Sequence, residues 1–286
     1  MPKAPRLEDR LAALSDLRQD PTAPEARKEF VKCLASKISL LAAKAARIVG
    51  ECKVDDLTPQ LVDAFQRFMI DPVASDRRCE AKLAIVKALE ALEYPSYEPF
   101  LRGIRHVQME PSFGPPVDTA IELRALSAIG LVRANYPDVG VELVTLLADK
   151  QRDARIGAAR ALAYWSTGAG ALLLRFKILT GDPEPEVIGE CFSGLLYIEP
   201  RSLDFVAAYL DDAEPAIAEG AALALGESHR EEAFEILKQH VKPTILRPTI
   251  MLAIALLRND TAVEYLRSLL PDRDAAKALE IYKDKS

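Results

Sequence analysis

The stretch DARIGAARALAYW, Asp153–Trp165, sets the pattern that decides the fold. Its apolar residues recur at the spacing of one face of an α-helix, at Ile156, Ala159, Leu162 and Ala163. Inside it lies a six-residue segment, AARALA, whose fourth residue is small and whose fifth is aliphatic. A small residue lets a neighbouring helix approach closely, and the aliphatic residue fills the adjoining space. The stretch therefore predicts a helix that packs against another helix.

This six-residue segment recurs along the chain, and we call it the repeat segment. Six of its seven copies have Ala or Gly at the fourth position, and all seven have Val, Ile or Leu at the fifth. The copies are AARIVG at Ala45–Gly50, IVKALE at Ile85–Glu90, ALSAIG at Ala125–Gly130, AARALA at Ala158–Ala163, CFSGLL at Cys191–Leu196, AALALG at Ala221–Gly226 and LAIALL at Leu252–Leu257. Their starts are 40, 40, 33, 33, 30 and 31 residues apart. Repetition at such a period is typical of a solenoid, in which each unit packs only on its neighbours.

A second apolar-periodic helix is expected after each repeat segment, which makes the chain an all-α stack of antiparallel helix pairs. No segment alternates at period two for long enough to predict a strand. The second helices are expected near Leu57–Ile70, Ser96–Gln108, Asp138–Asp149, Ala169–Leu179, Ser202–Asp211, Glu231–Val241 and Thr261–Leu270.

Two helix starts share one arrangement. Pro185 and Pro215 each stand six residues before a repeat segment, where proline suits the first helical turn. Asp182 and Asp212 precede them as turn or cap residues.

We expect a single solenoid domain over residues 1–286, with repeats over 37–270 and capping helices at both ends. The N-terminal cap, residues 1–36, holds helices at Arg6–Arg18 and Pro24–Ser36, and the C-terminal cap covers residues 271–286. The segment MEPSFGPPVD, Met109–Asp118, is the richest in Pro and Gly and is predicted to be a projecting loop.

Three units in the middle of the chain resemble the short bacterial type of HEAT repeat. Each has an aliphatic residue, an acidic turn and a proline or polar helix start before the repeat segment. They are LADKQRDARIGAARALAYW at Leu147–Trp165, LTGDPEPEVIGECFSGLL at Leu179–Leu196 and LDDAEPAIAEGAALALG at Leu210–Gly226. The resemblance implies an α-solenoid of about seven helix pairs. It carries less about function, because such repeats occur in scaffolds, adaptors and a few enzymes.

The resemblance also implies a curved solenoid whose second helices line the concave face. Exposed residues on those helices would then form the binding surface, and several are basic although the protein is acidic. We predict a non-catalytic scaffold or adaptor whose concave face recognises a protein with an acidic surface. The alternative is that these cations pair with nearby carboxylates on ordinary solvated helix faces. The candidates are Gln66, Arg67, Arg102, Arg105, His106, Glu142, Arg175, Lys177, Tyr209, Lys238 and Arg267.

Charge and composition narrow the possible partners. The net charge of −6 argues against a nucleic-acid partner, whose binding depends on neutralising phosphates. We find no signal peptide and no apolar stretch long enough to span a membrane, and expect a bacterial cytoplasmic protein. The four cysteines form no CxxC pair and are interpreted as reduced thiols that mostly pack as small hydrophobic residues.

No catalytic, cofactor-binding or metal-binding motif is found, so no enzyme activity, cofactor or metal is expected. The HEAT-repeat deoxyhypusine hydroxylases bind iron through His-Glu pairs, and none of the three histidines here is followed by Glu. Glu186, Glu190 and Glu219 are interpreted as solvated helix faces, and Trp165 as a packing residue at a turn.

Three alternatives stay open at this point. The chain could be a HEAT-like nucleic-acid-binding or DNA-repair protein, which would need a continuous basic groove. It could be a lyase-like accessory protein for a cofactor or chromophore, which would need an apolar pocket. It could also act only as an oligomer, assembled through Met109–Asp118 or the terminal helices.

Overall fold

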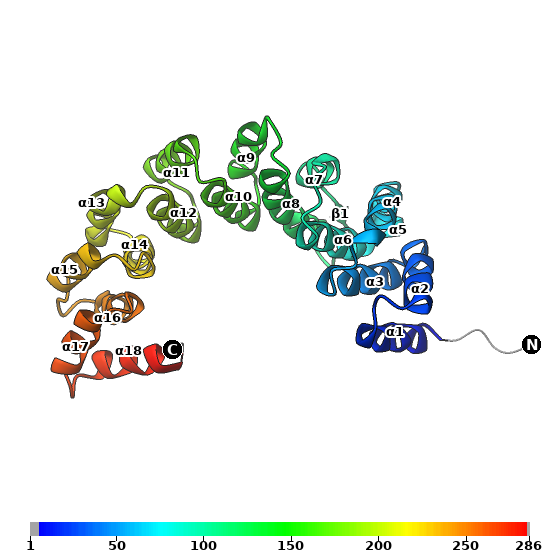
Figure 1. Ribbon diagram of the computed structural model, residues 1–286. Coiled ribbons are helices and arrows are strands. Elements are labelled where there is room, and N and C mark those ends of the chain that lie inside the picture. The colour runs from blue at the N-terminus through cyan, green and yellow to red at the C-terminus, as the bar shows by residue number, and fades with distance from the viewer. Residues whose placement is uncertain (1–5, 285–286) are drawn as a thin grey trace, which may run out of the picture. The chain divides into compact units, whose positions relative to one another are not determined.

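The seven repeat segments lie in helices, except for Leu257 just beyond α16 (Arg247–Leu256), and each is followed by a second helix, as the sequence predicts (Figure 1). The structure is a computed structural model that describes the backbone of residues 6–284 and the side chains of residues 6–281. The chain forms two compact units, Met1–Ala158 and Ala159–Ser286.

The helix pairs follow one another in chain order. The first helices, which carry the repeat segments, are α3 (Ser39–Glu51), α6 (Glu80–Ala91), α8 (Ile121–Arg133), α10 (Arg152–Trp165), α12 (Pro185–Ile198), α14 (Pro215–Glu227) and α16 (Arg247–Leu256). The second helices are α4 (Thr58–Phe68), α7 (Glu98–Ile104), α9 (Val139–Leu147), α11 (Gly168–Thr180), α13 (Leu203–Ala207), α15 (Glu231–Gln239) and α17 (Asp260–Ser268). The 3₁₀ helix η5 (Ala208–Asp211) extends α13. The architecture is thus an all-α solenoid of HEAT-like helix pairs.

The ends and connections are also largely helical. The predicted N-terminal capping helices are α1 (Leu7–Asp16), followed by η1 (Leu17–Gln19), and α2 (Pro24–Leu34). The predicted C-terminal capping helix is α18 (Arg273–Asp284). Short elements within connections are η2 (Asp55–Leu57), α5 (Pro72–Ser75), η3 (Arg77–Cys79) and η4 (Pro200–Ser202).

The repeat segment forms the core between neighbouring first helices. Its fourth residue is buried in all seven copies, and its fifth is buried in all but two, Ile129 and Leu256. Small residues in and beside it allow backbones to touch. A Cβ placed on Gly226 of α14 would lie 2.8 Å from the Cα of Ala253 in α16. That spacing is too short for a side chain, so glycine is required there.

An aspartate closes the turn before several first helices. Asp182 accepts the backbone N–H of Glu184, and Asp212 accepts that of Glu214, each at 2.9 Å. The helices then start at Pro185 and Pro215, as predicted. Asp118 and Asp149 form the same turn before α8 and α10, at 3.0 and 2.8 Å.

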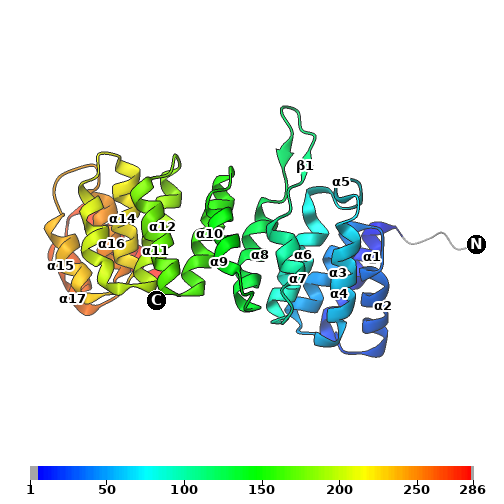
Figure 2. The same ribbon diagram turned by 90° about the horizontal axis from the view of Figure 1, so that it is seen from above.

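The prediction that Met109–Asp118 projects as a loop is confirmed (Figure 2), but the expectation that the chain has no strand is wrong here. The ends of this segment pair as two short antiparallel strands, β1 (Met109–Glu110) and β2 (Val117–Asp118), with Met109 opposite Asp118. Figure 2 shows that this hairpin projects beyond the helices of its unit. The strands are only two residues long, too short for a period-two pattern to reveal them.

Candidate functional site

Within Ala159–Ser286, the first helices α12, α14 and α16 lie on the inner side of the bend (Figure 1). The second helices α11, α13, α15 and α17 lie on the outer side. The expectation that second helices line the concave face is therefore wrong for this unit. The inward-facing surface is built instead by the helices that carry the repeat segments.

Two of the predicted cations in Met1–Ala158 make contacts inside their unit. The Arg67 guanidinium donates a hydrogen bond to the carbonyl of Leu34, the last residue of α2. It also donates to the carbonyl of Ser36, just beyond that helix, at 3.2 Å. Burial lowers the pKa of Arg67. Arg105, at the end of α7, binds both carboxylate oxygens of the nearly buried Glu142 in α9. Both arginines thus join neighbouring helix pairs, as the carboxylate-pairing alternative supposes for Arg105.

Arg102 and His106 lie near Arg105 in the sequence and differ from it in their surroundings. His106 is half-buried and its Nε2 lies 3.1 Å from Oε1 of Gln108. Burial lowers the pKa of His106, so its imidazole is neutral at pH 7. Arg102 is half-buried on α7.

In Ala159–Ser286 the predicted residues also contact their own unit. Arg175 lies over the ring of Phe205 at 3.9 Å and donates to the Ser202 hydroxyl at 3.3 Å. Lys177 forms an ion pair with Asp182 at 2.7 Å, which holds the turn before α12.

The remaining three candidates lie further along the unit. The Tyr209 ring packs 4.9 Å from that of Phe192, and burial raises the pKa of Tyr209. Lys238 lies 3.4 Å from Glu235, and Arg267 is exposed in the last turn of α17. As residues that bind a partner, all eleven candidates stay predictions: Gln66, Arg67, Arg102, Arg105, His106, Glu142, Arg175, Lys177, Tyr209, Lys238 and Arg267.

A groove runs over the inner surface of α12 and α14. Its two adjoining hollows have cavity volumes of about 750 and about 490 Å³. The glutamates that the sequence placed on solvated faces line it, including Glu190, which pairs with Arg160 at 2.8 Å. Gly189 and Gly220 form its floor, because the two helices approach closely there. Among the side chains described, no three His, Cys, Asp or Glu residues are placed to hold a metal ion.

An exposed apolar stripe lies on α11, and the sequence interpretation missed it. Leu172, Phe176 and Leu179 are 69%, 65% and 64% exposed, at i, i+4 and i+7 on one helical face. The opposite face of α11 is buried in the core, at Leu174 and Ile178 among others. The signal was present in GAGALLLRFKILT, which has more apolar residues than one core-facing stripe needs.

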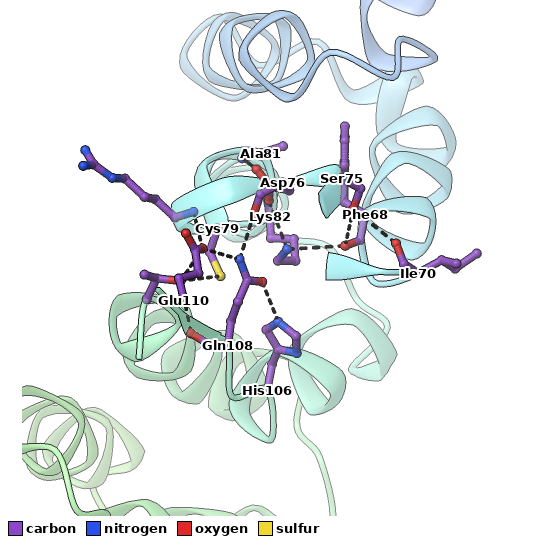
Figure 3. A network of polar contacts seen from close by, with 12 residues as sticks. Phe68, Ile70, Ser75, Asp76, Cys79, Ala81, Lys82, His106, Gln108 and Glu110 are labelled. Carbon is purple, nitrogen blue, oxygen red and sulfur yellow. Dashed lines mark hydrogen bonds and ion pairs between the residues drawn. The ribbon is translucent and has the colours of Figure 1, made fainter. Parts of the chain in front are cut away.

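A second missed feature is a buried polar network in Met1–Ala158 (Figure 3). Asp76 and Lys82 form an ion pair at 3.2 Å with both side chains 0% exposed. Asp76 also accepts the backbone N–H groups of Ala81 and Lys82 at 2.9 Å each, and Lys82 donates to the carbonyl of Phe68 at 3.3 Å. The pair fixes the short segment that leads into α6.

Gln108 joins this pair to the hairpin (Figure 3). Its Nε2 donates to the carbonyl of Asp76 at 2.9 Å and to the Glu110 carboxylate at 2.7 Å. Glu110 also accepts the backbone N–H of Arg78 at 2.6 Å and the Thr119 hydroxyl at 2.8 Å. Burial would raise the pKa of Glu110, but these three hydrogen bonds and the charge of Arg77 outweigh it and lower the pKa. Glu110 is therefore an ionised anchor for the base of the hairpin.

The four cysteines are free thiols. Burial raises the pKa of Cys79 to about 11 and that of Cys191 to about 12, and it also raises the pKa of Cys33. Cys52 is half-buried.

Three solved structures are similar to this chain over most of its length. The X-ray structure of YibA from Escherichia coli is 14% identical, matches 99% of both chains and has a TM-score of 0.50. Human deoxyhypusine hydroxylase in complex with glycerol is 20% identical over 89% of this chain and 91% of its own, with a TM-score of 0.34. An engineered protein from the Northeast Structural Genomics Consortium is 17% identical over 98% and 97%, with a TM-score of 0.37.

The match to YibA bears on architecture and not on activity. The similarity to YibA supports a shared helical-repeat fold. No protein-family model and no curated protein matches the sequence. Over residues 6–284, no helix combines the length and the apolar character needed to cross a bilayer.

Proposed function

We propose that this protein is a non-catalytic scaffold that binds another protein through the exposed face of α11. The observation that carries the proposal is the stripe of Leu172, Phe176 and Leu179, each about two-thirds exposed. Contiguous exposed apolar side chains mark interaction surfaces in soluble proteins. Three such side chains on one helical face fit the apolar side of a partner helix.

The rest of the unit supports this use of α11. Arg175 and Lys177 lie on the same helix, and their contacts with Ser202, Phe205 and Asp182 fix α11 to the next repeat. The stripe is therefore presented on a backbone that is already ordered, which reduces the entropy lost on binding. The basic residues predicted from sequence would act here mainly by positioning the apolar stripe.

Photo-crosslinking in the native host tests the proposal. A benzophenone amino acid at Phe176 is expected to give a discrete protein adduct. The matched control carries the same group at Ala216, an exposed position of the first helix α14. Adducts at both positions, or at neither, would refute the proposed use of α11.

A second step tests the energetic role of the stripe. Phe176→Asp is expected to weaken binding of the crosslinked partner by about tenfold or more, as an apolar anchor at an interface does. Tyr197→Asp, which alters an aromatic residue 72% exposed on α12, serves as the control and should leave affinity unchanged.

A further inference from the structure

We propose that the hairpin tip and the adjacent η3 turn form a second binding site, which takes an acidic protein segment that also carries apolar side chains. The site lies in Met1–Ala158, whereas α11 lies in Ala159–Ser286. The inference shares one premise with the proposed function, which is that the protein binds another protein.

The tip presents an aromatic side chain from an ordered support. Phe113 is 115% exposed, the highest exposure among the large apolar residues described, and Met109 and Val117 are each 50% exposed below it. The Ser112 hydroxyl donates to the carbonyl of Pro115 at 2.7 Å and accepts the N–H of Gly114 at 3.1 Å. The turn is thus closed by its own hydrogen bonds, and Phe113 projects at its centre.

The base of the hairpin is fixed to the body of the unit. Gln108 is 1% exposed, and all the polar groups of its side chain are used in bonds to His106, Asp76 and Glu110. This anchor ties the hairpin to the α5–η3 segment. It holds a projecting aromatic residue at a set position relative to the rest of the unit, as preorganised binding requires.

The same network places two arginines beside the hairpin. Arg78 and Cys79 adopt left-handed backbone conformations, with φ of 59° and 54°, which are uncommon for residues other than glycine. Glu110 holds this turn through the backbone N–H of Arg78, and Asp76 holds it through the N–H groups that follow. The side chains of Arg77 and Arg78 are consequently left exposed.

These arginines differ from most others in the unit. Arg47, Arg105 and Arg133 are paired with carboxylates at the surface. Over the side chains described, neither Arg77 nor Arg78 forms an ion pair, and the charge of Arg77 acts on the buried Glu110. Two exposed guanidinium groups at the base of the hairpin and an exposed aromatic ring at its tip complement carboxylates and apolar side chains on one partner segment.

Fluorescence anisotropy with the full chain tests the inference. The probe is a short labelled peptide rich in glutamate with interspersed leucine and phenylalanine. Two comparison probes are the same peptide with lysine in place of glutamate, and a single-stranded oligonucleotide of similar charge. We expect saturable binding of the acidic peptide alone. No binding of it, equal binding of the lysine peptide, or tighter binding of the oligonucleotide would overturn the inference.

Two variants locate the site. Arg77→Glu/Arg78→Glu and, separately, Phe113→Ala are each expected to weaken peptide binding about tenfold, which is about 1.4 kcal/mol. Matched controls are Arg201→Glu/Arg230→Glu, two exposed arginines of the other unit, and Tyr197→Ala. Controls that weaken binding as much as the site variants would show non-specific attraction and overturn the inference.

Gln108→Leu tests the positioning role of the network. This variant leaves Phe113 and both arginines in the chain. We expect peptide binding to weaken about tenfold, because the anchored geometry of the hairpin is lost. Circular dichroism confirms that the helices persist. Unchanged binding by folded Gln108→Leu would overturn the positioning role. If hairpin variants bind the peptide normally while Phe176→Asp loses its partner, the inference fails and the proposed function stands. If hairpin variants lose the peptide while Phe176→Asp keeps its partner, the proposed function fails and the inference stands.

Discussion

Removing the buried cation at Lys82 should destabilise the first unit strongly. In Lys82→Met the apolar stem is kept, but Asp76 loses its ion-pair partner at a site where both side chains are 0% exposed. Leaving one buried charge without its partner costs about 3–5 kcal/mol. Asp76 keeps two backbone N–H donors, which partly solvate its charge, so we expect the lower end, about 3 kcal/mol.

The control is the same substitution on the same helix. Lys87 pairs with Glu122 at 2.7 Å, but the two side chains are 51% and 61% exposed. An exposed pair contributes about 0–1 kcal/mol, so Lys87→Met should be nearly neutral. The two variants therefore separate the effect of burial from the effect of losing a lysine.

Urea unfolding and hydrogen exchange together provide the assay. A loss of about 3 kcal/mol corresponds to a rise of about 150-fold in the open population. Exchange should accelerate by that factor at the amides of Ala81 and Lys82, which bond to Asp76, and at Arg78, which bonds to Glu110. Amides of α14 should change little, because each repeat is stabilised mainly by its neighbours. A stability loss within 1 kcal/mol of Lys87→Met would refute the buried-pair reasoning.

Three further outcomes follow from the packing and the pKa shifts. Gly226→Ala should cost about 1–3 kcal/mol in urea unfolding, because its Cβ would lie 2.4 Å from the Ala253 carbonyl oxygen, whereas Gly168→Ala, with open space around it, should not destabilise. Ellman's reagent should titrate only Cys52 rapidly in the native protein and all four thiols in urea; a second fast thiol would contradict the burial of the others. Glu110 has a lowered folded pKa, so its stabilising effect should be complete above about pH 4.3 and disappear as pH falls through the folded value. The stability gap between wild type and Glu110→Gln should accordingly shrink in acid, and a gap that stays constant down to strongly acid pH would contradict this.

The helical architecture was predictable because it depends on short-range periodicity. A small fourth residue and an aliphatic fifth recur at seven places, and each copy needs only its neighbours to be buried. The side of the bend was not predictable, since it depends on slight rotations between successive helix pairs. The roles of the predicted cations were also hidden. Whether Arg105 meets a ligand or Glu142 depends on a residue 37 positions away.

The unequal spacing of the repeat segments holds more information than the sequence interpretation drew from it. The two spacings of 40 residues exceed the later ones, and the surplus contains α5 with η3 in one case and the hairpin in the other. In the sequence they are two separate insertions with no visible relation. In the structure they meet, through Gln108 with Asp76 and Glu110 with Arg78, contacts that span 32 residues each. The two insertions are thus joined by hydrogen bonds, beside the buried ion pair of Asp76 with Lys82 of α6. Their pairing fixes the hairpin to the α5–η3 segment, and the proposed second binding site depends on that fixed geometry.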